Sequence, residues 1–104
     1  MQEEHEMEII KKANGEELTV TLVGRLDTTT APDLENELKD ALAGVKKLVF
    51  DIEKLEYISS AGLRVLLSNQ KIMNKQGEMI IRNASEDVKE IFDVTGFCDI
   101  LTIE

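Results

Sequence analysis

The sequence predicts an α/β fold, a single domain with a mixed β-sheet and helices mainly on one face. Segments with strand-like alternation and segments with helical spacing follow in the order β-β-α-β-α-β-α. Strand–helix–strand alternation implies parallel pairing with right-handed crossovers, and three helices are too few to suggest a doubly wound sheet. The length of 104 residues suits one domain, so residues 1–104 are expected to fold together, with residues 1–6 flexible.

A hairpin is predicted at the start of the fold. Residues 8–12 are expected to form a short strand, and Asn14-Gly15 is a typical hairpin turn signal. Residues 18–23 alternate and are rich in β-branched side chains, which indicates a second strand. The two strands are therefore expected to pair antiparallel.

The first helix is predicted to begin at Thr30, which can cap it, with Asp33 three residues later as a short version of a capping box. Pro32 falls in the first turn, where its missing N–H costs nothing. Gly44 is the expected stop. Apolar residues recur at helical spacing at Ala31, Leu34, Leu38, Ala41, Leu42 and Val45.

The third strand is predicted over residues 47–51, and residues 55–60 are expected to be an irregular lead-in to the next helix. This second helix is expected to run from about residue 60 to residue 74 and to stop at Gly77.

Residues 79–82 fit a fourth strand. Ser85 is expected to cap a third helix, which Gly96 ends. Residues 100–103 are expected to be either a final edge strand or a docked tail.

Composition narrows the class of protein. The formal net charge of −9 argues against nucleic acid and against an anionic membrane surface, because both require a basic face. No apolar run approaches the length of about 20 residues that a membrane helix needs. Cys98 is the only cysteine and the first residues are acidic and polar, so a cytoplasmic location is expected.

Enzymatic chemistry finds little support in the sequence. Ser59-Ser60 lies at a strand-to-helix turn, but a nucleophilic serine needs a base, and the only histidine is His5 near the N-terminus. Neither a G-x-S-x-G elbow nor a glycine-rich phosphate loop is present. One histidine and one cysteine far apart do not make a zinc site. We therefore predict a protein that is not an enzyme, without a metal or a cofactor.

Topology predicts a cluster at one edge of the sheet. The second and third strands open successive βα units, so their carboxyl ends lie at the same edge, where sites form in open α/β sheets. Asp27, Thr28 and Thr29 are therefore expected to be neighbours of Ser60 in space.

Ser60 is expected at the N-terminus of the second helix, where backbone N–H groups and the helix dipole favour negative charge. A phosphoryl group there would add a charge of about −1.5 to −2 without melting the helix. The alternative interpretation is that Ser60 is only the helix cap.

A helical wheel of the second helix separates three sets of side chains. The expected core side holds Leu63, Leu66 and Leu67, and a polar, basic stripe holds Arg64, Ser68, Lys71 and Lys75. Ala61, Val65 and Ile72 fall away from the core. This off-core apolar strip either forms a docking surface or packs under a neighbouring loop.

The segment LEYISSAGLRVLL, residues 55–67, strongly resembles the signature of the STAS family, which includes the anti-sigma-factor antagonists. Residues 24–31, GRLDTTTA, are similar to the turn of the family, and residues 77–97 are similar to its C-terminal third. The resemblance covers nearly the whole chain in order. It implies the same fold, a mixed sheet with helices on one side.

The resemblance also implies a function. Members of this size bind an anti-sigma factor that is also a serine kinase, and binding releases the sigma factor. The kinase phosphorylates a serine that matches Ser60 here, which dissolves the complex, and a PP2C-like serine phosphatase restores it. The position of Asp27 belongs to the kinase-contacting loop. The expected partner-binding residues are Asp27, Thr28, Thr29, Arg64, Val65, Ser68 and Ile72.

One departure leaves alternatives open. Well-known members have Asp before the phosphorylated serine, where this chain has Ser59, so Ser59 is an alternative phosphoacceptor. Other family members keep the fold without phosphorylation, so a constitutive STAS scaffold or a transport-system subunit is the main alternative. A nucleotide-hydrolysing protein is a third hypothesis, which rests only on the edge of the sheet.

Overall fold

Residues 7–104 are described by the computed structural model, and within them the strands form a single sheet in the order β1-β2-β3-β4. β1 and β2 pair antiparallel, whereas β2 with β3 and β3 with β4 pair parallel, as predicted. The predicted flexible segment 1–6 and His5 lie outside the described residues. The strands are β1 Met7–Asn14, β2 Glu17–Leu26, β3 Lys47–Ile58 and β4 Glu78–Arg82.

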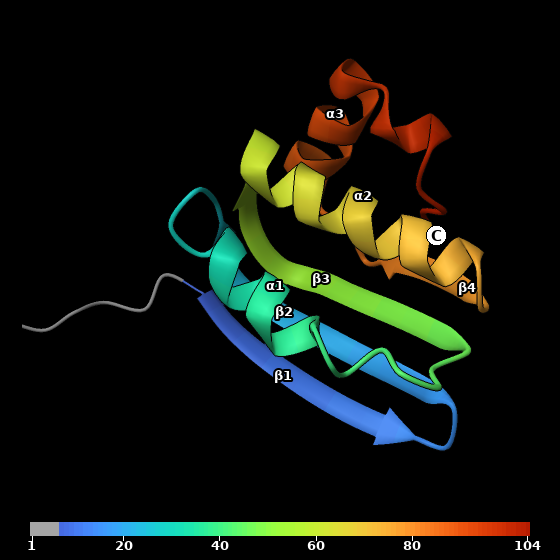
Figure 1. The fold of residues 1–104 in the computed structure, drawn as a ribbon. Helices are drawn as coiled ribbons and strands as arrows, with labels where there is room; N and C mark the ends of the chain where they lie inside the picture. Colours follow the sequence, from blue (N-terminus) through green and yellow to red (C-terminus); the bar gives the residue numbers. More distant parts are fainter. Residues whose placement is uncertain (1–6) are drawn as a thin grey trace, which may run out of the picture.

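The helices cover one face of this sheet (Figure 1). α1 lies beside α2, α2 packs on β3 and β4, and α3 packs on β3. This is the mixed sheet with helices mainly on one face that the sequence predicts, because each βα unit crosses over with the same hand. The helices are α1 Ala31–Leu38, α2 Ser60–Asn74 and α3 Glu86–Thr95, followed by the 3₁₀ turn η1 Phe97–Asp99.

The core lies between the sheet and the helices. Along β2, Leu18, Val20 and Leu22 are buried at every second position, as a strand with one covered face requires. Phe50 of β3 and Phe92 of α3 are completely buried in the same cluster. The large aliphatic and aromatic side chains thus hold the helices against the sheet through apolar burial.

The expected start and the expected end of α3 are both confirmed. The Ser85 hydroxyl accepts a hydrogen bond from the Val88 amide at 3.2 Å, and Gly96 ends the helix at φ +80°. The hairpin is also confirmed, with Gly15 at φ +64° in a two-residue loop between paired Asn14 and Glu17.

α1 ends at Leu38, so the predicted continuation of this helix to Gly44 is wrong. The apolar spacing continues because Leu42 and Val45 still pack into the core from a chain of turns. The side-chain amide of Gln76, after α2, donates to the carbonyl oxygens of Leu42 and Val45, both at 2.7 Å. A side chain from 31 residues or more away therefore satisfies carbonyls that helical bonds would otherwise use.

The start of α1 also differs from the prediction. Thr30 is the N-cap residue, but its side chain makes no capping hydrogen bond, so the predicted capping box does not form. The Thr30 hydroxyl instead donates to the Arg25 carbonyl and accepts from the Asp27 amide, both at 2.8 Å. The Thr30 hydroxyl is therefore bonded to the loop before α1 and does not cap the helix.

β3 runs to Ile58, so the predicted irregular lead-in over residues 55–60 is wrong. Shifts of register between β2 and β3 absorb the extra length and keep both strands paired to their ends. At the C-terminus, Ile103 forms one isolated parallel bridge with Ile81. Of the two alternatives for residues 100–103, a docked tail therefore describes the structure better than a strand.

We predict that Gln76→Met destabilises the fold. Methionine keeps the length of the side chain but removes the donor, so both carbonyls lose the hydrogen bond from the amide. The Leu42 carbonyl keeps the bond from the Val45 amide at 3.1 Å, whereas the Val45 carbonyl loses the partner that Gln76 supplies. Urea unfolding should show a loss of about 1–3 kcal/mol. The exposed neighbour Lys75→Ala should change the free energy of unfolding by less than about 0.5 kcal/mol. Equal stability of the Gln76→Met and wild-type chains would contradict the role of this amide.

Candidate functional site

The carboxyl ends of β2 and β3 meet, as the topology predicts. Leu26 pairs with Ile58 at the ends of the two strands, and the Ser59 amide donates to the Leu26 carbonyl at 2.9 Å. The loop that begins at Asp27 and the start of α2 at Ser60 therefore lie at the same edge of the sheet.

Asp27 organises the loop between β2 and α1. Its Oδ1 accepts from the backbone amides of Thr29 at 3.0 Å and Thr30 at 3.1 Å, and its Oδ2 lies 3.6 Å from Nε of Arg25. Its carbonyl oxygen accepts from the Ala31 amide at 2.8 Å, which opens α1. The loop is thus held in one shape by hydrogen bonds, with Thr28 and Thr29 exposed on it.

A contact that the sequence did not predict lies beside this loop. The Arg25 guanidinium stacks on the ring of Tyr57, 4.6 Å from its centroid, while Tyr57 is 37% exposed. Arg25 and Tyr57 are direct partners in the register of β2 and β3. The pair was missed because the third strand was predicted to stop before Tyr57.

The two serines at the start of α2 have different roles. Ser59 is the N-cap, and its hydroxyl accepts from the Gly62 amide at 3.3 Å. Ser60 is the first helical residue, is exposed, and its hydroxyl bonds to no residue within 7–104. The alternative interpretation of Ser60 as the helix cap is therefore wrong, because the backbone at Ser59 is extended and that of Ser60 is already helical.

The predicted strip along α2 is only partly exposed. Of the predicted apolar strip, Ile72 is exposed and Ala61 is half-buried, but Val65 is only 8% exposed, so its prediction as an off-core residue is wrong. Arg64 and Ser68 of the predicted basic stripe are exposed. Val65 faces a space that Leu38 of α1 also lines. The wheel of one helix cannot show this, because α1 was not part of it.

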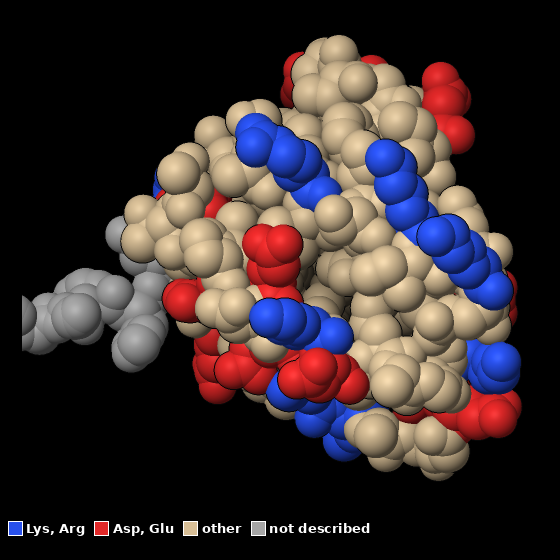
Figure 2. Space-filling model, viewed as in Figure 1, with Lys and Arg blue, Asp and Glu red and all other residues tan. Residues whose placement is uncertain are grey.

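Charge is distributed unevenly over the surface. The chain carries a net charge of −9, but α2 contains no Asp or Glu. Its exposed cations are Arg64 and Lys71, and Lys75 follows at the C-cap. Figure 2 shows basic side chains along the face that α2 forms, with most acidic side chains elsewhere in this view. A partner that docks on α2 meets positive charge.

Other kinds of function would depend on the cysteine, on side chains of metal-binding types or on the helices within residues 7–104. The hydrogen bond to Asp93 raises the pKa of the exposed Cys98 thiol, and the charge of Asp99 acts in the same direction, which disfavours the nucleophilic thiolate. Within residues 7–104, no three side chains of the metal-binding types gather as a metal site would require. None of the helices in this range has both the length and the apolar character to span a bilayer.

The edge of the sheet thus carries an exposed serine at a helix start, an ordered loop and a helix face with basic side chains. The family model of the STAS domain matches residues 7–104, and the chain belongs to the STAS domain family. This confirms the family that the resemblance of residues 55–67 predicts.

Curated relatives carry the name of anti-sigma factor antagonists. The chain is 36% identical over 88 residues to the putative anti-sigma factor antagonist BtrV of Bordetella bronchiseptica, covering 83% of this chain and 76% of BtrV. It is 31% identical over 93 residues to the anti-sigma-B factor antagonist of Bacillus subtilis, covering 88% and 85%.

Solved structures share the fold. An anti-sigma factor antagonist from Mycobacterium paratuberculosis matches with a TM-score of 0.84 at 20% identity, covering 93% of this chain and 84% of that one. The unphosphorylated form of the anti-sigma factor antagonist SpoIIAA matches with a TM-score of 0.72 at 17% identity, covering 94% and 86%. At these identities the match concerns the arrangement of the strands and helices.

We predict that Gly62→Ala destabilises the chain. A Cβ at Gly62 would lie 2.7 Å from Cγ of Leu26 and 2.9 Å from Cγ1 of Ile58, so α2 would have to move away from the strand ends. Urea unfolding should show a loss of about 1–3 kcal/mol. Ser68→Ala, on the exposed face of the same helix, should change the stability by less than about 0.5 kcal/mol.

The sign of the change in unfolding free energy tests whether α2 packs closely at Gly62. Alanine in place of glycine inside a helix normally stabilises by about 0.5–1 kcal/mol. A stabilised Gly62→Ala variant would therefore contradict the close packing of α2 on Leu26 and Ile58.

Proposed function

We propose that this chain is an anti-sigma factor antagonist that is switched off by phosphorylation of Ser60. In its active form it binds an anti-sigma factor that is also a serine kinase, and binding releases the sigma factor. The observation that carries the proposal is the division of roles at the start of α2: Ser59 caps the helix, and the exposed Ser60 hydroxyl is engaged by no residue within 7–104.

The position of Ser60 suits a phosphoryl group. The first turn of a helix offers unsatisfied N–H groups and the positive end of the dipole. α2 has no acidic residue in its first turn, and the Arg64 side chain begins one turn further on. The added charge of about −1.5 to −2 would therefore be tolerated by the helix.

The fold supports a switch that changes the surface rather than the architecture. The structures of SpoIIAA in its unphosphorylated and phosphorylated forms match this chain with TM-scores of 0.72 and 0.71. Their arrangement of strands and helices is thus nearly equally similar to that of this chain. A phosphoryl group on Ser60 would act by placing charge inside the interface, at the edge of the sheet where the Asp27 loop also begins.

The proposed interface spans the edge of the sheet and one face of α2. Its members are Asp27, Thr28 and Thr29 in the loop and Arg64, Val65, Ser68 and Ile72 on the helix. Asp27 acts mainly by holding the loop in shape, because its carboxylate binds the backbone of that loop. We further propose a cytoplasmic location and a PP2C-like serine phosphatase that restores the active form.

We predict that Ser60→Asp weakens the binding of the partner kinase by about tenfold or more, whereas Ser60→Ala binds permanently. Ser59→Asp is the matched control, because it adds the same charge one residue earlier and aspartate caps helices well. It should bind as the wild type does. The measurement is calorimetric titration with the kinase that a Ser60→Ala bait recovers from the native cells.

Mass spectrometry of the protein from its native cells, grown with and without stress, tests the acceptor. A phosphate on Ser60 that changes with the growth condition is the expected result. A phosphate on Ser59 would support a phosphorylation switch but would make Ser59, and not Ser60, the phosphoacceptor. A chain that is never modified, with equal affinity for all variants, would favour a constitutive STAS scaffold or transport-system subunit.

A further inference from the structure

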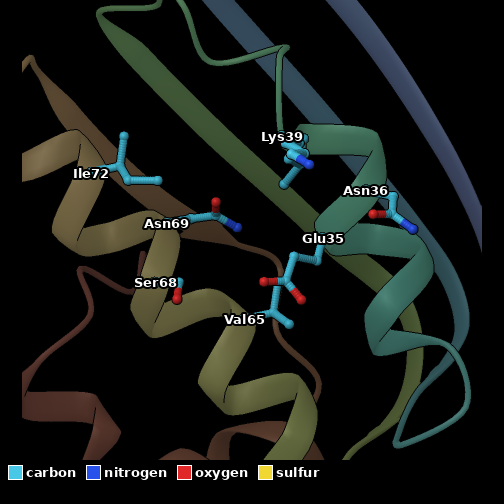
Figure 3. A pocket seen from close by; sticks show the side chains of 8 residues that line it. Glu35, Asn36, Lys39, Val65, Ser68, Asn69 and Ile72 are labelled. Atoms are coloured by element: carbon cyan, nitrogen blue, oxygen red, sulfur yellow. The ribbon is translucent and has the colours of Figure 1, made fainter.

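A groove of about 300 Å³ separates α1 from α2 (Figure 3). Its apolar surface comes from Leu38 of α1 and from Val65 and Ile72 of α2. Leu38 and Val65 are buried, whereas Ile72, at the rim, is 43% exposed. The groove therefore has an apolar floor and opens to the surface between exposed residues of both walls, Glu35 and Lys39 on one and Ser68 and Ile72 on the other.

Asn69 gives this groove an unsatisfied donor. The residue is only 6% exposed, and its Nδ2 is buried without a hydrogen-bond partner within residues 7–104. In Figure 3 its amide points from α2 toward α1, into the groove. A buried donor without a partner costs about 1–3 kcal/mol, which a ligand with a suitable acceptor would recover.

Glu35 supplies an acceptor on the opposite wall. Its side chain extends from α1 toward α2 in Figure 3 and forms no hydrogen bond or ion pair with any described residue. A donor on one wall and an acceptor on the other match the C=O and N–H groups of a peptide. An apolar floor between them matches the side chain that the same residue carries.

The groove is continuous with the proposed interface. Ser68 and Ile72 line it and follow Ser60 and Arg64 along α2 at the spacing of one helical turn. Any protein that covers Ser60 and Arg64 therefore comes close to the open side of the groove. The cations of α2, together with Lys39 on the rim, favour acidic residues beside the segment that enters it.

We propose that the groove between α1 and α2 is the anchor site for one aliphatic side chain of the partner protein, whose main-chain carbonyl accepts a hydrogen bond from Asn69 Nδ2. The inference rests on the proposed function for the identity of the partner. A side chain that fills a desolvated pocket near the centre of an interface often dominates its affinity. Asn69 is then a specificity residue, although it is buried in the free protein.

The first test uses the full chain and a single-residue probe, N-acetyl-L-leucine N-methylamide, followed by NMR. Saturable shifts are expected at the Asn69 side-chain amide and at the methyl groups of Val65 and Ile72. The same compound built on glycine lacks the side chain and should cause none. Asn69→Asp should abolish the shifts, because it replaces the donor by an acceptor. Asn36→Asp, at the edge of the groove with its amide pointing away from α2, is the matched control and should keep them.

The second test uses the partner kinase recovered by the Ser60→Ala bait. Asn69→Asp in that background should weaken binding about tenfold, with Asn36→Asp unchanged. Equal shifts with the glycine probe, or shifts that survive Asn69→Asp, would overturn the anchor. Leucine-probe binding without any loss of partner affinity would show a small-ligand site and would also overturn it.

Failure of the switch is a separate result. The probe experiment does not involve Ser60 and should be the same in the Ser60→Ala and Ser60→Asp chains. If these two variants bind the partner equally, the proposed phosphorylation switch fails. A loss of binding in Asn69→Asp would still support the anchor in that case.

Discussion

The hydrogen bond from the Ser59 amide to the Leu26 carbonyl joins the two halves of the site. It ties the end of β2 to the start of α2, and Gly62 allows the helix to lie directly against Leu26 and Ile58. Because β2 leads into the Asp27 loop and β3 leads into α2, this contact sets the distance between the loop and Ser60. The relative positions of the loop residues and the α2 residues in the proposed interface therefore depend on this contact.

Order on both sides of the junction comes from side chains that bond to nearby backbone. Asp27 closes its loop and Ser59 caps α2, so neither side chain relies on a partner for its position. A preordered surface loses less conformational entropy on binding. The exposed groups that are left over, Ser60 and Arg64 among them, are then available for recognition and modification. The charge of α2 is opposite in sign to that of the whole chain, so an acidic surface of a partner is attracted to α2 and repelled by the rest of the chain.

Sequence reasoning identified the element order and the shared sheet edge at which the Asp27 loop and α2 begin, because alternation, caps and parallel topology are local or follow from chirality. It misplaced Val65, because burial on that side of α2 depends on α1. It also ended β3 too early and so missed the stacking of Arg25 on Tyr57, which needs the register of two strands. Asn69 gave no signal, because a polar residue in an amphipathic helix looks solvated until its surroundings are known.

The sequence by itself determined the type of each main element, the order of the strands and helices, the turn at Gly15, the caps of α3 and the acidic balance of the chain. These depend on neighbouring residues, or on the handedness of βα crossovers. Only the tertiary structure decided where α1 ends, which of two adjacent serines caps α2, and which side chains of α2 the groove buries. The physical reason is that each of these outcomes depends on contacts between residues far apart in sequence, such as Gln76 with Leu42 and α1 with α2, whose energies no local pattern contains.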